Sequence, residues 1–169
     1  MQTEAREMWM SWLRDAHAME AQAETMLNAQ AGRLENYPAL RMRIEQHLRE
    51  TTAQREALER LFATLGEDVS AVKAGMGKLM ALGQGMAGAF ASDEVMKGSL
   101  ASYAFEHMEI ASYTALIAGA EELGLTEAVA VLTPILEQER AMADWLAENL
   151  PPLTRSFLAR AEADLEAKR

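Results

Sequence analysis

The stretch FEHMEIASY, residues 105–113, places acidic residues inside a run that otherwise favours a buried helix. Glu106 and Glu109 are three residues apart, so both lie on one face of such a helix, and Tyr113 follows one turn later. A buried carboxylate is unfavourable unless it is paired, protonated or bound to metal. The stretch therefore predicts a helix whose core-facing side carries a polar function.

The composition predicts an all-α protein with one domain. The chain has 169 residues, of which half are hydrophobic, and good helix formers dominate while Val and Ile are scarce. This length is sufficient for a single core. We expect a single domain over residues 1–169, with a core helical bundle at about 4–150 and a C-terminal extension at 151–169.

Glycines and prolines divide the chain into helices. Pro38 suits a first helical turn, Gly66 and Gly124 suit helix ends, and Thr126 suits a helix start. Long helices are expected at residues 4–31, 38–65, 92–123 and 126–150, and a short, frayed helix at 153–167 is expected after Pro151-Pro152.

The connections predict the topology. Those at 32–37 and 124–125 are short, so the helices that they join should be antiparallel neighbours. The segment 67–91 is long enough to cross the bundle end to end and to carry a short extra helix at about 70–90. These features are typical of a ferritin-like four-helix bundle, in which one crossover is long.

The core-facing stripe of each helix is apolar at its ends and polar near its middle. The polar positions are Glu20 in the first helix, His47, Thr51 and Gln54 in the second, Glu106 and Glu109 in the third, and Glu139 in the fourth. In an antiparallel bundle the middles of the helices meet at one level. Four helices should therefore direct polar side chains towards one point, with carboxylates from the first, third and fourth and an imidazole from the second.

One or two divalent cations at that point would compensate the buried charge. Carboxylates with imidazole suit iron or manganese, and zinc is a possible substitute. The candidate ligands are Glu20, His47, Glu50, Glu106, Glu109 and Glu139. A known bundle solution takes a Glu from each of two helices and Glu-x-x-His from the other two. Here the second helix has the reversed order His47-x-x-Glu50, and Met142 stands where a second histidine would be expected.

Other polar residues are candidate neighbours of the ligands. His17 precedes Glu20 by one turn, and an outer position is favoured for it. His107, one residue from the acidic face, could donate a hydrogen bond to a ligand or be a ligand itself. Thr51 and Gln138 complete this set. Tyr113 is either a redox-active or proton-donating neighbour, or a core tyrosine with its hydroxyl satisfied.

Several segments resemble the bacterial stress-associated ferritin-like proteins YciE and YciF. They are WLRDAHAMEAQA, HLRET, SDEVMKG, YAFEHMEIASY and EQERAMADWL, in a match from residue 9 to about 158. The resemblance implies a ferritin-like bundle, usually dimeric, with a di-metal centre and ferroxidase-like or peroxide-consuming activity. This chain departs from the family pattern at two positions of the last helix. Gln138 precedes Glu139 where family members often have paired acids, and Ala143 stands where many relatives have an acid. With fewer anionic ligands, a weakened second metal position or a mononuclear site is also open.

Charge and composition exclude several partners. The net charge is −10, and the arginines at 41–60 alternate with glutamates, so neither nucleic acid nor an anionic membrane is an expected partner. The chain has no cysteine, which excludes disulfides and thiol chemistry and fits a cytoplasmic protein. No signal peptide is expected, and the apolar stretch 74–91 is too interrupted to cross a membrane. A homodimer contact is expected through the Gly/Met-rich segment 70–91.

Three functions remain open from the sequence. The first is a di-iron or di-manganese oxidoreductase of the stress response, acting on Fe(II) and oxygen or on hydrogen peroxide. The second is a metal-free or metal-poor dimeric helical scaffold, in which the acids pair with arginines. The third is a bundle that only buffers or carries metal.

Overall fold

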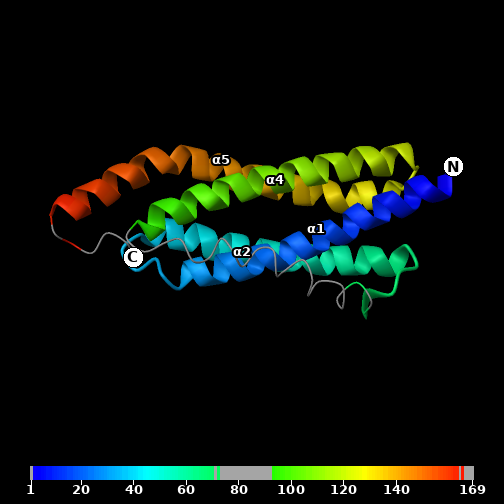
Figure 1. Cartoon of the computed structure of the whole chain (residues 1–169), viewed down its shortest axis with the longest axis horizontal. Coiled ribbons are helices and arrows are strands. Elements are labelled where there is room, and N and C mark those ends of the chain that lie inside the picture. Colours follow the sequence, from blue (N-terminus) through cyan, green and yellow to red (C-terminus); the bar gives the residue numbers. More distant parts are fainter. Residues whose placement is uncertain (1, 71, 73–92, 164, 166–169) are drawn as a thin grey trace.

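The computed structural model describes residues 2–70, 72, 93–163 and 165, and these form four long helices (Figure 1). The helices are α1 (Gln2–Ala31), α2 (Pro38–Thr64), α4 (Glu94–Glu122) and α5 (Thr126–Glu162). No strand occurs among the described residues, so the predicted all-α class is confirmed. None of the helices in this part of the chain has the length and apolar character needed to span a bilayer.

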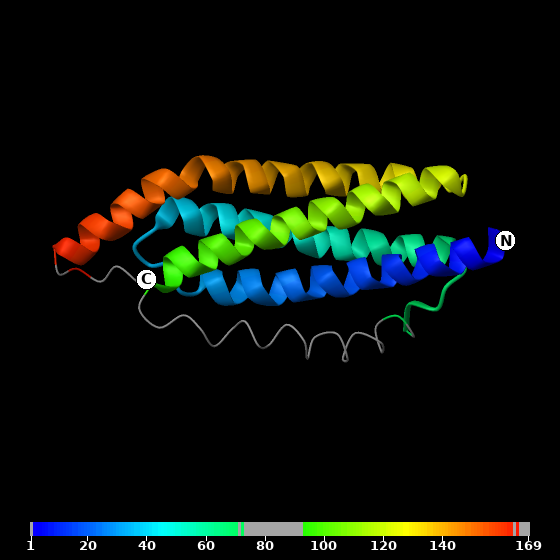
Figure 2. The ribbon, with the colours of Figure 1, turned by 45° about the horizontal axis from the view of Figure 1, so that its top comes forward.

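The helices form two antiparallel hairpins that pack side by side. The closest pairings are α1 with α2 and α4 with α5, and α1 with α4 and α2 with α5 join the hairpins. The end of α2 and the start of α4 lie at opposite ends of the bundle (Figure 2). This is the arrangement predicted for a ferritin-like bundle with one long crossover.

Two glycines end helices as the sequence predicts. Gly66 and Gly124 have φ values of +84° and +69°, a conformation that a residue without Cβ adopts at little cost. After α2, the N–H of Glu67 donates to the carbonyl of Phe62 at 2.9 Å, which closes the helix end. The chain can then reverse direction within a few residues.

The predicted end of the last helix before Pro151 is wrong, because α5 continues through both prolines to Glu162. The prolines remove the N–H groups that would bond to the carbonyls of residues 147 and 148, but these residues are exposed and their carbonyls can bond to water. Beyond the prolines, Leu153 and Phe157 pack against the core and hold the helix in place. The result is a bent helix rather than two helices (Figure 2).

A buried polar layer separates two apolar clusters. One cluster fills the end of the bundle near Trp9, Leu61 and Leu132, and the other fills the opposite end near Leu40 and Leu146. The buried polar residues of the layer between them include Glu20, His47, Thr51, Gln54, Glu106, Glu109 and Glu139. The predicted pattern of apolar ends and a polar middle is therefore present in the fold.

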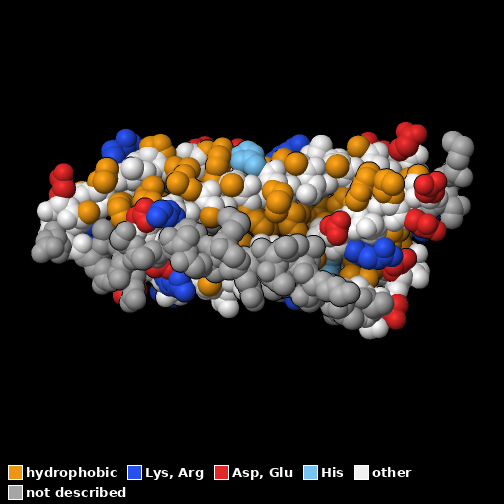
Figure 3. Space-filling model, in the orientation of Figure 1, with side chains coloured by type: hydrophobic (Ala, Val, Ile, Leu, Met, Phe, Trp, Pro, Cys, Tyr) orange, Lys and Arg blue, Asp and Glu red, His pale blue; other side chains and the backbone are white. Residues whose placement is uncertain are grey.

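The surface carries apolar side chains as well as charge. Hydrophobic side chains run along much of the face seen in Figure 3, between scattered acidic and basic groups. Among the described residues, Trp12 of α1 and Leu100 and Met108 of α4 are exposed. Nearly all of the segment 70–91 lies outside the described residues, so the extra helix and the dimer contact expected there stay predictions.

Candidate metal centre

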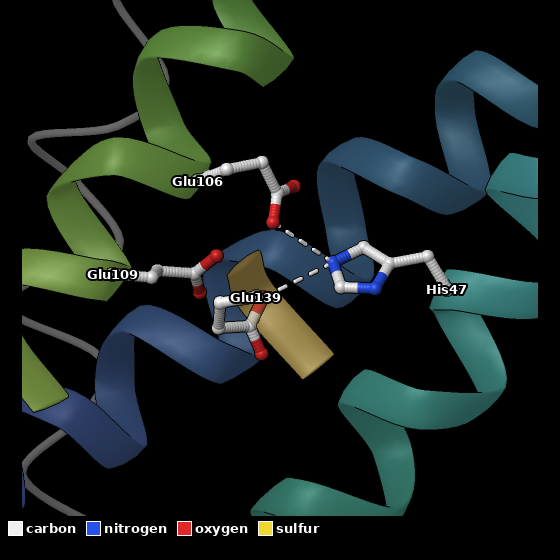
Figure 4. Close-up of side chains that lie close together, drawn as sticks. All are labelled: His47, Glu106, Glu109 and Glu139. Atoms are coloured by element: carbon white, nitrogen blue, oxygen red, sulfur yellow. Dashed lines mark ion pairs between the residues drawn. The ribbon is translucent and has the colours of Figure 1, made fainter. Parts of the chain in front are cut away.

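Four side chains from three helices converge in the middle of the bundle (Figure 4). His47 comes from α2, Glu106 and Glu109 from α4, and Glu139 from α5. Each offers one ligand atom, and these atoms all lie within 4.8 Å of one another. The four residues are 0–2 % exposed. The structure thus brings together four of the six predicted ligands.

The imidazole of His47 has acidic partners on both ring nitrogens. Its Nε2 lies 3.2 Å from Glu106 Oε2 and 3.3 Å from Glu139 Oε2, inside the cluster (Figure 4). Its Nδ1 lies 3.0 Å from Glu50 Oε2, on the outer side of the ring. Glu50 therefore contacts the back of the ring and is not part of the group of four. A carboxylate behind a metal-binding histidine commonly fixes its orientation and tautomer.

Arg43 and Gln46 hold the carboxylate of Glu50 in turn. Arg43 Nη1 lies 3.3 Å from Glu50 Oε2, and Gln46 donates to Glu50 Oε1 at 2.8 Å. All of these residues are on α2, so a single helix supplies the imidazole and its support. The sequence interpretation missed Arg43, although its position one turn before His47 was a usable signal.

Several carboxylate oxygens in the layer are buried without a hydrogen-bond partner among the described residues. Both oxygens of Glu109 are in this state, and so are Oε1 of Glu139 and Oε2 of Glu20, whereas Oε2 of Glu139 is paired with His47. Leaving such groups unsatisfied is expensive, and a cation placed between them would remove the cost. The donor set of carboxylates and one imidazole suits iron or manganese.

Three acids of the layer, Glu20, Glu106 and Glu109, hold protons more tightly than ordinary glutamates. Burial, and then the charges of Glu20, Glu139 and Glu106, raise the pKa of Glu109 well above its usual value. Burial also raises the pKa of Glu106, to about 7, although His47 opposes the shift. Without a cation, protons can therefore neutralise part of the cluster.

The pKa values of His47 and Glu50 both shift in the direction that favours the charged form. Burial alone would lower the pKa of His47, but the carboxylates of Glu106, Glu139 and Glu50 outweigh it and raise the pKa to about 12. For Glu50, burial favours the neutral form, and His47, Gln46 and Arg43 reverse this and lower the pKa to about 2. A charged imidazole between carboxylates is the favoured state of the metal-free cluster.

Glu20 lies at the edge of the cluster and is bonded to Tyr113. It is fully buried on α1, and the hydroxyl of Tyr113 on α4 donates to its Oε1. Burial, and then the charge of Glu139, raise the pKa of Glu20 well above its usual value. The charges of the cluster therefore affect the pKa of Glu20, although this residue is outside the compact group of four.

The predicted neighbours occupy different places. His17 is fully buried rather than in the favoured outer position, and its Nε2 lies 3.2 Å from Glu59 Oε1. His107 is exposed and packs edge-on against Tyr103. Thr51 is buried in the polar layer and Gln138 is exposed.

Gln54 is a site-flanking residue that was not among the predicted neighbours. It is buried on the same face of α2 as His47, and its Nε2 donates to Gln138 Oε1 at 2.9 Å. The sequence did contain a signal, because Gln54 interrupts the apolar stripe of its helix. This signal does not by itself assign Gln54 to the site, because a neutral amide is a weaker indication of a metal site than a carboxylate.

The fold and the site together define the class of this protein: a ferritin-like four-helix bundle with a buried carboxylate–histidine cluster at its centre. The chain belongs to the family described as Domain of unknown function (DUF892), whose model matches residues 4–159.

Solved structures agree with this assignment. The protein XCC3681 of Xanthomonas campestris pv. campestris is 40% identical with a TM-score of 0.78, and the match covers 94% of this chain and 99% of that one. YcfI of Rhodopseudomonas palustris is 31% identical with a TM-score of 0.69, covering 85% and 92%. The E. coli stress protein YciF is 24% identical with a TM-score of 0.68, covering 86% and 94%. The resemblance to the YciE/YciF family is confirmed.

Proposed function

We propose that the protein binds one or two iron or manganese ions in its polar layer and is redox-active towards oxygen or hydrogen peroxide. The observation that carries this proposal is the convergence of His47, Glu106, Glu109 and Glu139, with buried carboxylate oxygens that lack hydrogen-bond partners among the described residues. Side chains of this kind, at one depth of a closed bundle, are costly without a cation and are well suited to one.

The bound ions would supply the electrons. Two Fe(II) ions that each lose one electron can, with two protons, reduce hydrogen peroxide to two water molecules, and manganese at the same place can support peroxide disproportionation. The overlap in ligand demand between iron and manganese leaves both metals in the proposal.

The side chains divide the remaining tasks. His47 Nε2 and the carboxylates of Glu106, Glu109 and Glu139 would bind the ion, and Glu50 keeps a proton on Nδ1 so that Nε2 is the ligand atom. Tyr113 fixes Oε1 of Glu20, which leaves Oε2 for a second ion. The apolar clusters on both sides exclude bulk water from the layer.

Elemental analysis tests the proposal. The protein is purified without chelator or affinity metal and is also titrated anaerobically with Fe(II) and Mn(II). We expect near-stoichiometric metal in the wild type and its loss in a Glu109→Gln, Glu139→Gln double variant. Glu137→Gln is a matched control, because Glu137 is also on α5 but is exposed and pairs with Arg140 on the surface. A wild type that takes up neither metal would contradict the proposal.

One observation favours the metal-free scaffold as a second candidate. The positive charge of His47 compensates part of the cluster, and the raised pKa values of Glu20, Glu106 and Glu109 let protons neutralise more of it. In that reading the cluster is a structural network. Thermal unfolding separates the two candidates: a metal-binding protein gains stability on adding Mn(II) or Fe(II), whereas a scaffold of this kind does not.

A further inference from the structure

The hydroxyl of Thr51 breaks a rule that other threonines of the bundle follow. The side-chain oxygens of Thr25, Thr52, Thr64, Thr114, Thr133 and Thr154 each donate to the backbone carbonyl four residues earlier, at 2.7–3.2 Å. Thr51 is 1 % exposed, yet its Oγ1 has no hydrogen-bond partner among the described residues. A buried hydroxyl that forgoes the nearby backbone acceptor needs another partner.

Gln54, one turn further along α2, is in a similar state. It is 2 % exposed, and its Nε2 is fixed by the bond to Gln138 on α5. Its Oε1 is buried and has no partner among the residues that the structure describes. The bond to Gln138 therefore holds the amide of Gln54 in one orientation, in which the acceptor Oε1 has no hydrogen bond.

Both residues lie on the buried face of α2 that also carries His47. Thr51 stands on α2 between His47, which contacts Glu139 of α5, and Gln54, which contacts Gln138 of α5. It is separated from His47 by about 6 Å and from Gln54 by about 4.5 Å along the helix axis. Thr51 and Gln54 are thus on the face of α2 that meets α5.

We propose that Thr51 Oγ1 and Gln54 Oε1 form a binding site for one small molecule with O–H groups, occupied by water at rest and by hydrogen peroxide as the oxidant. A molecule of this size can bridge two groups about one helical turn apart with O–H···O bonds of about 2.8 Å each. Buried polar atoms without protein partners commonly hold an ordered water.

The chemistry of the two oxygens selects the ligand. Gln54 Oε1 is an acceptor only, so its ligand must carry a hydrogen atom. Water and hydrogen peroxide have O–H groups, whereas dioxygen has none and cannot satisfy this atom. The site therefore favours peroxide over dioxygen as the oxidant of the neighbouring centre. The water part of this inference is independent of any metal, and the peroxide part rests on the proposed redox function.

A metal-free crystal structure and thermal unfolding test the water site. We expect ordered water within hydrogen-bond distance of both oxygens, and its loss in Thr51→Val. That variant should lower Tm by about 2–4 °C, because a bridging bond is lost. Thr52→Val is the matched control: Thr52 is adjacent and bonds to the Leu48 carbonyl. A dry site, with Tm unchanged or raised in Thr51→Val, would overturn the inference, since removal of an unsatisfied hydroxyl should not destabilise.

Single-turnover reactions of the iron-loaded protein test the choice of oxidant. A Thr51→Val, Gln54→Leu double variant should react with hydrogen peroxide about tenfold more slowly, as expected for the loss of a directed hydrogen bond. Its rate with dioxygen and its iron content should stay within about twofold of the wild type. Equal effects on both oxidants, or none on peroxide, overturn the peroxide assignment. A wild type that binds no metal overturns the proposed function and the peroxide assignment together, and the water site is then decided by the metal-free measurements alone.

Discussion

Glu50 Oε2 lies 3.0 Å from Nδ1 of His47, on the side of the ring that faces away from the carboxylate cluster. Because the two residues are three positions apart on α2, the helix itself sets this contact. The contact fixes which ring nitrogen faces the centre. Glu50 is therefore the residue through which the orientation of His47 can be tested.

Replacement of Glu50 with Gln should weaken metal binding. The amide can still accept from Nδ1, but the charge that supports the imidazole is lost, so we expect the affinity for Mn(II) to fall about 10- to 100-fold. Competition with a chelator of known affinity measures the affinity of the protein for Mn(II). Glu45→Gln, which changes a surface residue of the same helix that pairs with Arg41, should leave the affinity unchanged. An unchanged affinity in Glu50→Gln would show that Glu50 does not support the ligand.

The metal-free protein should lose stability as the pH rises. The pKa of Glu106 is raised to about 7 and those of Glu20 and Glu109 are raised well above their usual value, so the folded state keeps protons that the unfolded state releases above about pH 4.5. His47 acts in the same direction above about pH 6.5, since its folded pKa is about 12.

Thermal unfolding between pH 5 and pH 8 in a chelating buffer checks this prediction, with a lower Tm expected at pH 8. Glu50, with a lowered pKa of about 2, adds stability that is lost only at pH values below about 4.5, outside this window. A Tm that rises from pH 5 to pH 8 would mean that the acids of the layer are ionised in the metal-free fold.

Replacement of Glu109 with Gln should stabilise the metal-free protein at pH 8. The change removes a fully buried carboxylate whose oxygens have no hydrogen-bond partner among the described residues. It also removes a ligand, so the increase in Tm that metal gives the wild type should shrink or vanish. Differential scanning calorimetry with and without Mn(II) measures both effects. A variant that is less stable without metal and keeps the full metal-induced shift would argue against the proposed centre.

A pair of glycines in α4 tests the packing of the bundle on either side of the polar layer. A Cβ at residue 119 would lie 2.6 Å from Cδ1 of Trp9, whose Nε1 donates to the Leu116 carbonyl at 2.8 Å. Gly119→Ala should therefore cost about 1–3 kcal/mol in the free energy of unfolding. At residue 98 the Cβ would meet the end of the flexible Gln30 side chain at 3.1 Å. Gly98→Ala should be neutral or stabilising by up to about 1 kcal/mol through helix propensity, and urea denaturation compares the two.

Helical periodicity was enough to predict the convergence of His47, Glu106, Glu109 and Glu139. Each interrupts an apolar stripe near the middle of its helix, and an antiparallel bundle places the middles together. The place of Glu50 was not predictable in this way, because the ring nitrogen that faces the core depends on the side-chain rotamer of His47. The bond between Tyr113 and Glu20 depends on the axial alignment of α1 with α4, which periodicity does not define.

Two features of the structure differ from what the neighbouring sequence predicts. The Pro151-Pro152 pair predicted a helix end, but packing of Leu153 and Phe157 on the core keeps α5 continuous. His17 was expected in an outer position because apolar residues flank it, yet it is fully buried beside Glu59. In both cases tertiary packing outweighed the preference read from the neighbouring residues.

The polar layer also fixes the alignment of the two hairpins. A slide of one hairpin against the other by one helical turn, about 5.4 Å, would move Glu106 and Glu109 towards an apolar cluster and leave His47 without its partners. An all-leucine core would resist such a slide much less, because one apolar contact replaces another. The buried polar layer therefore permits only one axial alignment of the two hairpins, whether or not a metal ion is bound.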